Sequence, residues 1–123
     1  MKLILTSYLL FISLLSNAKE KAEIKYFTNG EAMLIVLSKE GIDLNESCWE
    51  NDCLAKKALN LKIELSKLNI SGGKNPGAVA CTKKLNGQIL MLKEVKTHSI
   101  NSYCLFNDGS FISNKTIYDK IIQ

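Results

Sequence analysis

The chain has 123 residues and a formal net charge of +4, with 16 basic and 12 acidic side chains. All the basic residues are lysines, and because bidentate recognition of phosphate usually uses arginine, we expect no nucleic-acid partner. One proline and seven glycines exclude a low-complexity or collagen-like chain, and the length suits a small domain with a modest core.

The N-terminus has the order of a secretory signal peptide over residues 1–18. A basic start is followed by an apolar stretch from Leu3 to Leu15 and by small residues that end at Ala18. This order predicts cleavage between Ala18 and Lys19. The alternative is an uncleaved anchor, but the stretch is shorter than the ~20 residues that span a bilayer. We therefore expect a periplasmic or secreted protein with no transmembrane segment after cleavage.

Residues 19–72 are predicted to form a helical N-terminal region. Thr28 followed by Glu31 fits a capping box, and Gly41 fits the position after a helix, which together predict a helix over residues 29–40. The β-branched residues in this apolar run leave a strand as the alternative.

A second helix is predicted from Cys48 to about Asn60, because apolar residues recur there at three- to five-residue steps. Residues 61–65 alternate in steps of two and fit a strand, but they also fit a continuation of the same helix.

Residues 73–123 are predicted to form a small disulfide-linked domain. Asn75-Pro76 fits a cap and the first position of a helix that runs to Leu85. Residues 88–93, 99–106 and 111–113 have strand character, and residues 114–123 form a short amphipathic tail, helical from Thr116. The predicted fold class is α+β: N-terminal helices followed by a helix packed on a small antiparallel β-meander, stabilised by disulfides.

The four cysteines follow the predicted signal peptide, and thiols in exported proteins tend to form disulfides. Three pairings are possible. Cys48 with Cys53 would close a tight loop, and Cys81 with Cys104 would join the predicted helix to a strand. Positions five apart on an ideal helix are poorly placed for a disulfide. Either the second helix begins after Cys48, or these two thiols pair elsewhere or stay free.

The residues from about 73 to 113 resemble a known family. They show an Asn-Pro start, a cysteine on a helix, a glycine break, and a cysteine followed by an Asp-Gly-Ser turn. This order resembles domain of unknown function 333, a small exported bacterial domain whose members are often labelled hemolysin-like. The matching runs are Asn75-Pro76-Gly77-Ala78-Val79-Ala80-Cys81, Leu85-Asn86-Gly87 and Tyr103-Cys104-Leu105-Phe106-Asn107-Asp108-Gly109-Ser110.

The resemblance implies that Cys81 and Cys104 are the family's paired cysteines. Many members carry two further cysteines and a tryptophan after the Asp-Gly-Ser turn, but here Ile112 takes the first of those positions and no cysteine follows Cys104. Both members of one pair are absent, so the cysteine count stays even. The family suggests nothing for residues 19–72.

No catalytic or metal-binding pattern stands out, and we expect no cofactor. The cysteine spacings are not those of zinc sites or of redox motifs. His98 is the sole histidine and lies in an expected exposed hairpin loop. Acidic residues near Trp49 are typical of sugar-binding surfaces, but a tryptophan on an apolar helical face is more often part of a core. Asp108 is expected to stabilise its own turn.

The sequence is therefore interpreted as an exported bacterial protein that is not an enzyme. The leading hypothesis is a binding or interaction module whose partner is an envelope or extracellular protein or polysaccharide. Two alternatives remain: a membrane-active, hemolysin-like protein, and an envelope hydrolase or protease inhibitor, for which residues 93–99 would supply the inhibitory loop.

Signal-peptide processing gives a direct test of the predicted compartment. If cleavage follows Ala18, the protein recovered outside the cytoplasm begins at Lys19, and intact-mass analysis of that fraction should give the corresponding mass. Retention of Met1 in the exported pool would contradict the prediction.

Overall fold

The computed structural model describes residues 21–123. The predicted signal peptide and its cleavage point between Ala18 and Lys19 lie outside the described residues.

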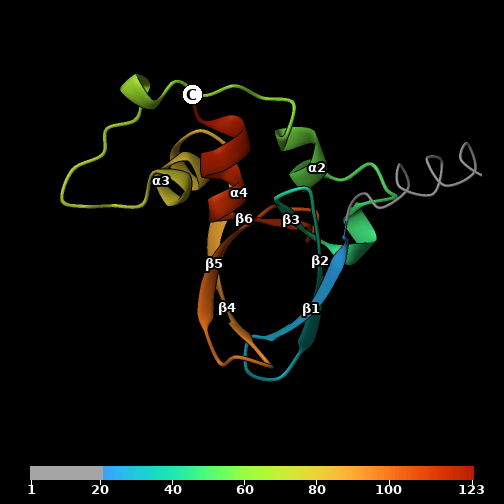
Figure 1. The fold of residues 1–123 in the computed structure, drawn as a ribbon. Coiled ribbons are helices and arrows are strands. Elements are labelled where there is room, and N and C mark those ends of the chain that lie inside the picture. Colours follow the sequence, from blue (N-terminus) through green and yellow to red (C-terminus); the bar gives the residue numbers. More distant parts are fainter. Residues whose placement is uncertain (1–20) are drawn as a thin grey trace, which may run out of the picture.

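Within these residues, six strands form a closed antiparallel barrel (Figure 1). Each strand pairs with both neighbours, in the spatial order β1-β2-β3-β6-β5-β4. The strands are β1 (Glu23–Thr28), β2 (Met33–Lys39), β3 (Ile42–Asn45), β4 (Gln88–Glu94), β5 (Ile100–Leu105) and β6 (Phe111–Ser113).

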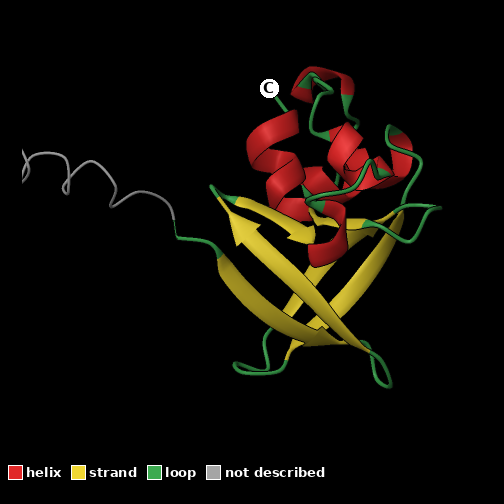
Figure 2. Ribbon diagram, turned by 90° about the vertical axis from the view of Figure 1, so that its right-hand side faces the viewer, coloured by secondary structure: helices red, strands yellow, loops and turns green. Residues whose placement is uncertain are grey.

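Most of the helices gather over one part of the barrel wall, beside β5, β6 and β3 (Figures 1 and 2). None of the helices in residues 21–123 is long and apolar enough to cross a membrane. The helical segments are η1 (Glu46–Cys48), α2 (Leu54–Ala58), η2 (Leu65–Lys67), α3 (Pro76–Lys83), α4 (Asn114–Thr116) and η3 (Ile117–Ile121). Helix α3 also contacts β4, and η1 lies beside β2.

The prediction of a helix over residues 29–40 was wrong, because this segment holds a hairpin turn and strand β2. The Thr28 hydroxyl accepts a hydrogen bond from the Gly30 N–H at 3.2 Å, inside the turn between β1 and β2, and caps no helix. Glu40 and Gly41 both have positive φ angles, 54° and 78°. Consecutive positive φ angles are typical of a tight two-residue hairpin. A helix end also needs a positive φ angle, so glycine is favoured in both structures.

The second predicted helix, from Cys48 to Asn60, was also too long. The chain forms the short η1, passes through an extended Cys53, and begins α2 only at Leu54. Residues 61–65 form neither a strand nor a helical continuation; Ile63 makes an isolated parallel bridge to Ile122.

The C-terminal elements lie close to their predicted positions, but the predicted fold class was wrong. Helix α3 begins at Pro76 with Asn75 as its cap, and β4, β5 and β6 pair in succession. These strands do not form a separate meander under N-terminal helices. They pair with β1 and β3, so strands from both sides of the expected boundary at residue 72 build one barrel.

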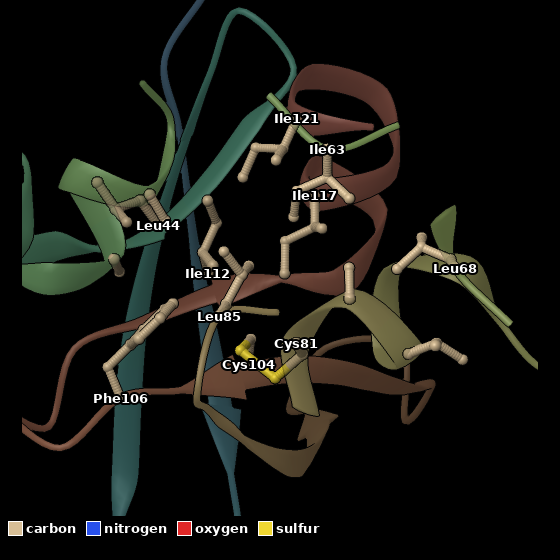
Figure 3. Close-up of a cluster of buried hydrophobic side chains, with 14 of the residues drawn as sticks. Leu44, Ile63, Leu68, Cys81, Leu85, Cys104, Phe106, Ile112, Ile117 and Ile121 are labelled. Carbon is tan, nitrogen blue, oxygen red and sulfur yellow. A yellow bond between two sulfur atoms is a disulfide. The ribbon is translucent and has the colours of Figure 1, made fainter. Parts of the chain in front are cut away.

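Strand alternation produces two apolar clusters, one on each side of the barrel wall. The first fills the barrel interior, where Tyr103 packs edge-to-face against two phenylalanine rings. It consists of Phe27, Val36, Leu92, Tyr103 and Phe111. The second lies between the outer wall and the helices (Figure 3) and includes Leu44, Ile112, Ile117 and Ile121.

The four cysteines lie in two pairs at disulfide distance, Cys48 with Cys53 and Cys81 with Cys104. The first pair bridges the extended segment between η1 and α2, so the geometric objection to pairing along one helix does not arise. The second pair joins α3 to β5 inside the outer cluster (Figure 3). Gly87 lies against this bridge, and a Cβ there would collide with the Cys104 sulfur.

The two bridges should differ in their contribution to stability. Replacing Cys81 and Cys104 with Ser should lower the free energy of unfolding by about 2–5 kcal/mol, because their bridge joins residues 23 apart. The bridge between Cys48 and Cys53 joins residues 5 apart, so the same change there should cost less. Urea unfolding of both double variants measures the difference. An equal or larger loss for the shorter loop would contradict this ranking.

Candidate functional site

A polar cavity of about 410 Å³ lies at one mouth of the barrel, within the size range of small-molecule sites. This is the end at which β1, β3 and β5 begin and β6 passes into α4. The lining comes from all of these elements and from the cap of α3, and Phe27 and Ile100 form its apolar part. The polar lining residues are Lys25, Asp43, Asn75, Asn101, Ser102, Tyr103, Ser113 and Lys115.

Asp43 is the fixed anion of the mouth. Its Oδ2 accepts a hydrogen bond from the Ser113 hydroxyl at 3.0 Å, and its Oδ1 accepts one from the Ser38 hydroxyl. Its backbone N–H donates to the Thr116 hydroxyl at 2.9 Å. These bonds connect β2, β3, β6 and α4 at a single residue. Asp43 is therefore held in place before any ligand arrives.

Two further side chains present donors because their oxygens are already occupied. The Ser102 oxygen accepts a hydrogen bond from the Asn114 amide at 2.9 Å, which leaves the Ser102 O–H able to donate. The Asn75 oxygen accepts the Gly77 N–H at 2.8 Å and the Ala78 N–H at 3.3 Å as the cap of α3. Its NH₂ group has no hydrogen-bond partner among residues 21–123.

The two lysines of the mouth differ in their surroundings. Lys115 pairs with Asp119 at 2.7 Å, and this hydrogen bond and charge raise the pKa of Lys115. Lys25 is half-buried on β1 and forms no ion pair with any other described residue. The Lys25 ammonium is thus the cation that a ligand can engage without first breaking an ion pair.

Tyr103 places a buried phenol at the base of the mouth. Burial disfavours the phenolate and raises the pKa of Tyr103, and the nearby carboxylates of Asp43 and Glu94 raise it further. Within the described part of the chain its hydroxyl has no hydrogen-bond partner. The phenol therefore stays protonated at neutral pH and can donate to a bound group.

Asn114 lies behind the lining and supports it. The residue is buried, and its Oδ1 is the one fully enclosed side-chain oxygen or nitrogen without a hydrogen-bond partner among residues 21–123. Its NH₂ group holds Ser102, and its backbone carbonyl lies so close to Gly77 that a Cβ there would overlap it. Asn114 thereby fixes the distance between α3 and the barrel mouth.

Other residues noted in the sequence lie outside this cavity. His98 lies exposed in the turn between β4 and β5. Trp49 is half-buried and donates from its indole nitrogen to the Leu37 carbonyl at 2.8 Å, beside β2 rather than on a helical face. The two cysteine pairs are structural features of the helical side.

Asp108 does more than stabilise its own turn. Its carboxylate accepts the Ser110 N–H at 3.0 Å and also the Leu54 N–H at 2.8 Å, so it caps α2 from a distant part of the chain. Desolvation opposes ionisation, but the bonds from Ser110 and Leu54 outweigh it and lower the pKa of Asp108.

Comparison with known proteins gives no further assignment, because no protein-family model, no curated protein and no solved structure matches this chain. Among residues 21–123, no group of three or more His, Cys, Asp or Glu side chains is arranged to hold a metal ion.

The sequence did not identify the residues of the mouth as a candidate site. Asp43 follows Gly41 by two residues, in a segment that we assigned to no element, and Lys25 precedes the first helix that we predicted. Their meeting depends on barrel closure. The residue types of β1 give no signal for this closure, because Lys25 faces the mouth while Ile24 and Tyr26 are exposed.

The raised pKa of Tyr103 predicts an alkaline loss of stability. In the unfolded chain the phenol ionises near pH ~10, while the folded chain retains the proton. Unfolding is therefore favoured increasingly as the pH rises above ~10, by up to about 1.4 kcal/mol per pH unit. Tyr103→Phe lacks this contribution. Above that pH, the free energy of unfolding of the wild type should therefore fall relative to that of the variant. Urea unfolding across the range measures it, with Tyr118→Phe as the exposed control. A difference in free energy of unfolding between wild type and Tyr103→Phe that does not vary with pH would contradict the raised pKa of Tyr103.

Proposed function

We propose that this protein is a non-enzymatic binding module that recognises an envelope polysaccharide through the mouth of its barrel. The observation that carries the proposal is the polar cavity of about 410 Å³. Its hydrogen-bond donors are oriented by the fold, and they surround one fixed carboxylate.

The hydrogen-bonding pattern supports a ligand rich in hydroxyl groups. Ser102, Tyr103, Asn75 and Lys25 offer donors, whereas Asp43 offers a carboxylate whose oxygens retain capacity to accept. A sugar hydroxyl both accepts and donates, so neighbouring hydroxyls of one saccharide unit can satisfy both kinds of group. A simple anion would satisfy the donors but would meet the negative charge of Asp43. A purely apolar ligand would leave all of these groups unpaired.

The proposed compartment agrees with this ligand. The two cysteine pairs at disulfide distance are consistent with an oxidising environment, and we propose that the protein is periplasmic or secreted. The relationship of residues 73–113 to domain of unknown function 333 stays a prediction. No observation on the described residues favours the membrane-active alternative or the hydrolase and inhibitor alternative over binding.

Removal of a single hydroxyl should weaken saccharide binding. We expect Tyr103→Phe to lower the affinity for soluble fragments of peptidoglycan glycan strands by about tenfold, the equivalent of one lost hydrogen bond of about 1.4 kcal/mol. Tyr118→Phe, at an exposed tyrosine of η3 outside the cavity, should leave the affinity unchanged. Isothermal titration calorimetry of the exported protein measures both.

A second matched pair of variants tests the role of the Lys25 ammonium. Lys25→Met should weaken binding, whereas Lys62→Met, at an exposed lysine that does not line the mouth, should not. Binding with equal affinity by all four variants would place the ligand elsewhere on the molecule. An absence of binding to peptidoglycan fragments and to other envelope saccharides would refute the proposed function.

A further inference from the structure

The barrel wall opposite the helices carries an apolar surface of which only Ile100 also lines the mouth. Six large hydrophobic side chains on or next to β1, β2, β4 and β5 are between 44% and 65% exposed. We call this surface the seam face, because it lies over the junction of β1 and β4. Its residues are Ile24, Tyr26, Met33, Met91, Val95 and Ile100.

Strand register places two ends of the seam face in one row across the sheet. Met33 pairs with Thr28, Thr28 pairs with Lys93, and Lys93 pairs with Ile100. These four residues form one row across four strands, and their side chains lie on the same face of the sheet. In the adjoining row, the Val95 N–H donates to the Tyr26 carbonyl at 2.9 Å. Thr28 and Lys93 thus interrupt the first row, but the exposed apolar side chains still cluster on one wall, and such clusters mark interaction sites.

The seam is one of two weakly paired junctions of the barrel. The other, between β3 and β6, pairs only at Leu44 with Ile112, but the helices cover it. β1 and β4 pair only at Phe27 with Glu94 and at Thr28 with Lys93, while β1 pairs with β2 along its full length. A groove of about 400 Å³ lies beside this junction. A partner that covers the groove would bury apolar surface and would exclude water from this short, uncovered ladder.

The charges around the groove indicate which partner fits. Its lining includes two acidic and two basic residues, Glu23, Glu94, Lys25 and Lys96. A lipid or polysaccharide surface of one sign would attract half of these charges and repel the others. A surface with the same balanced set can complement it, and a second copy of this chain has that set.

We propose that the protein forms a symmetric homodimer through the seam face. A two-fold axis along the seam brings β1 of each copy against the β4 end of the other, as in self-complementary interfaces. Tyr26 of one copy then packs on Val95 of the second, and Glu23 faces the turn that carries Lys96. Tyrosine and methionine, both present on this face, are enriched at protein interfaces.

Sedimentation velocity of the exported protein over a wide concentration range tests the dimer. Wild type should dimerise reversibly, and Ile24→Lys should raise the dissociation constant by at least tenfold. Leu61→Lys is the matched control, because Leu61 is equally exposed, at 49%, but lies beside α2 and outside the seam face. Circular dichroism should show both variants folded.

A charge exchange tests the proposed orientation. Glu23→Lys alone and Lys96→Glu alone should each weaken the dimer, because each puts like charges opposite one another. The double variant restores opposite charges and should recover the wild-type dissociation constant. Failure of the double variant to recover it would overturn the proposed axis.

The proposal as a whole fails if wild type stays monomeric at every concentration, or if Ile24→Lys and Leu61→Lys behave alike. Monomeric wild type that binds vesicles of anionic phospholipid would identify the seam face as a lipid-contacting surface and would equally overturn the dimer. These readouts are independent of saccharide binding, so the proposed function can fail while the dimer holds.

Discussion

The structure depends on the part of the barrel wall that is apolar on both faces, where β6 pairs with the C-terminal half of β5. Successive residues of these strands alternate between the barrel interior and the helical side, so Phe111 and Tyr103 point inward while Ile112 and Cys104 point outward. Strands buried on both faces contain little polar sequence, and Phe111–Ser113 is buried throughout. Burial on both sides makes this wall the rigid element to which the helices, the disulfide and the mouth are attached.

The polar mouth follows from the way this wall ends. At Ser113 the chain leaves β6, and the Ser113 oxygen caps α4 by accepting the Thr116 N–H at 3.0 Å. The same hydroxyl donates to Asp43, and Thr116 in turn accepts from the Asp43 backbone. Polar groups are therefore needed at the mouth, because the chain changes there from strand β6 to helix α4. The candidate site uses a network that the fold already requires, and Asp43 has a structural role whether or not a ligand is present.

The C-terminal half could be predicted from the sequence because its signals are local. Asn75-Pro76 defines the start of α3 within three residues, and Gly109 defines a turn between two strands. The N-terminal half could not, because its signals fit two structures equally well. Gly41 fits both a helix end and a hairpin, and the run at residues 32–37 is apolar on both strand faces, so it shows no clear alternation. The deciding information is the pairing of β1 with β4 and of β3 with β6, which joins residues more than sixty positions apart.

The same long-range closure explains why the two proposed binding surfaces lie next to each other. The covered wall is stabilised by an apolar cluster and by the bridge between Cys81 and Cys104, whereas the β1–β4 seam has a short ladder and no covering helix. Lys25 lines both the mouth and the groove beside the seam. Surface that is neither paired nor covered is where a partner gains the most by binding, because burial there excludes water from exposed apolar groups. The asymmetric placement of the helices thus leaves the seam uncovered, while the mouth is built between this open wall and the ends of α3 and α4.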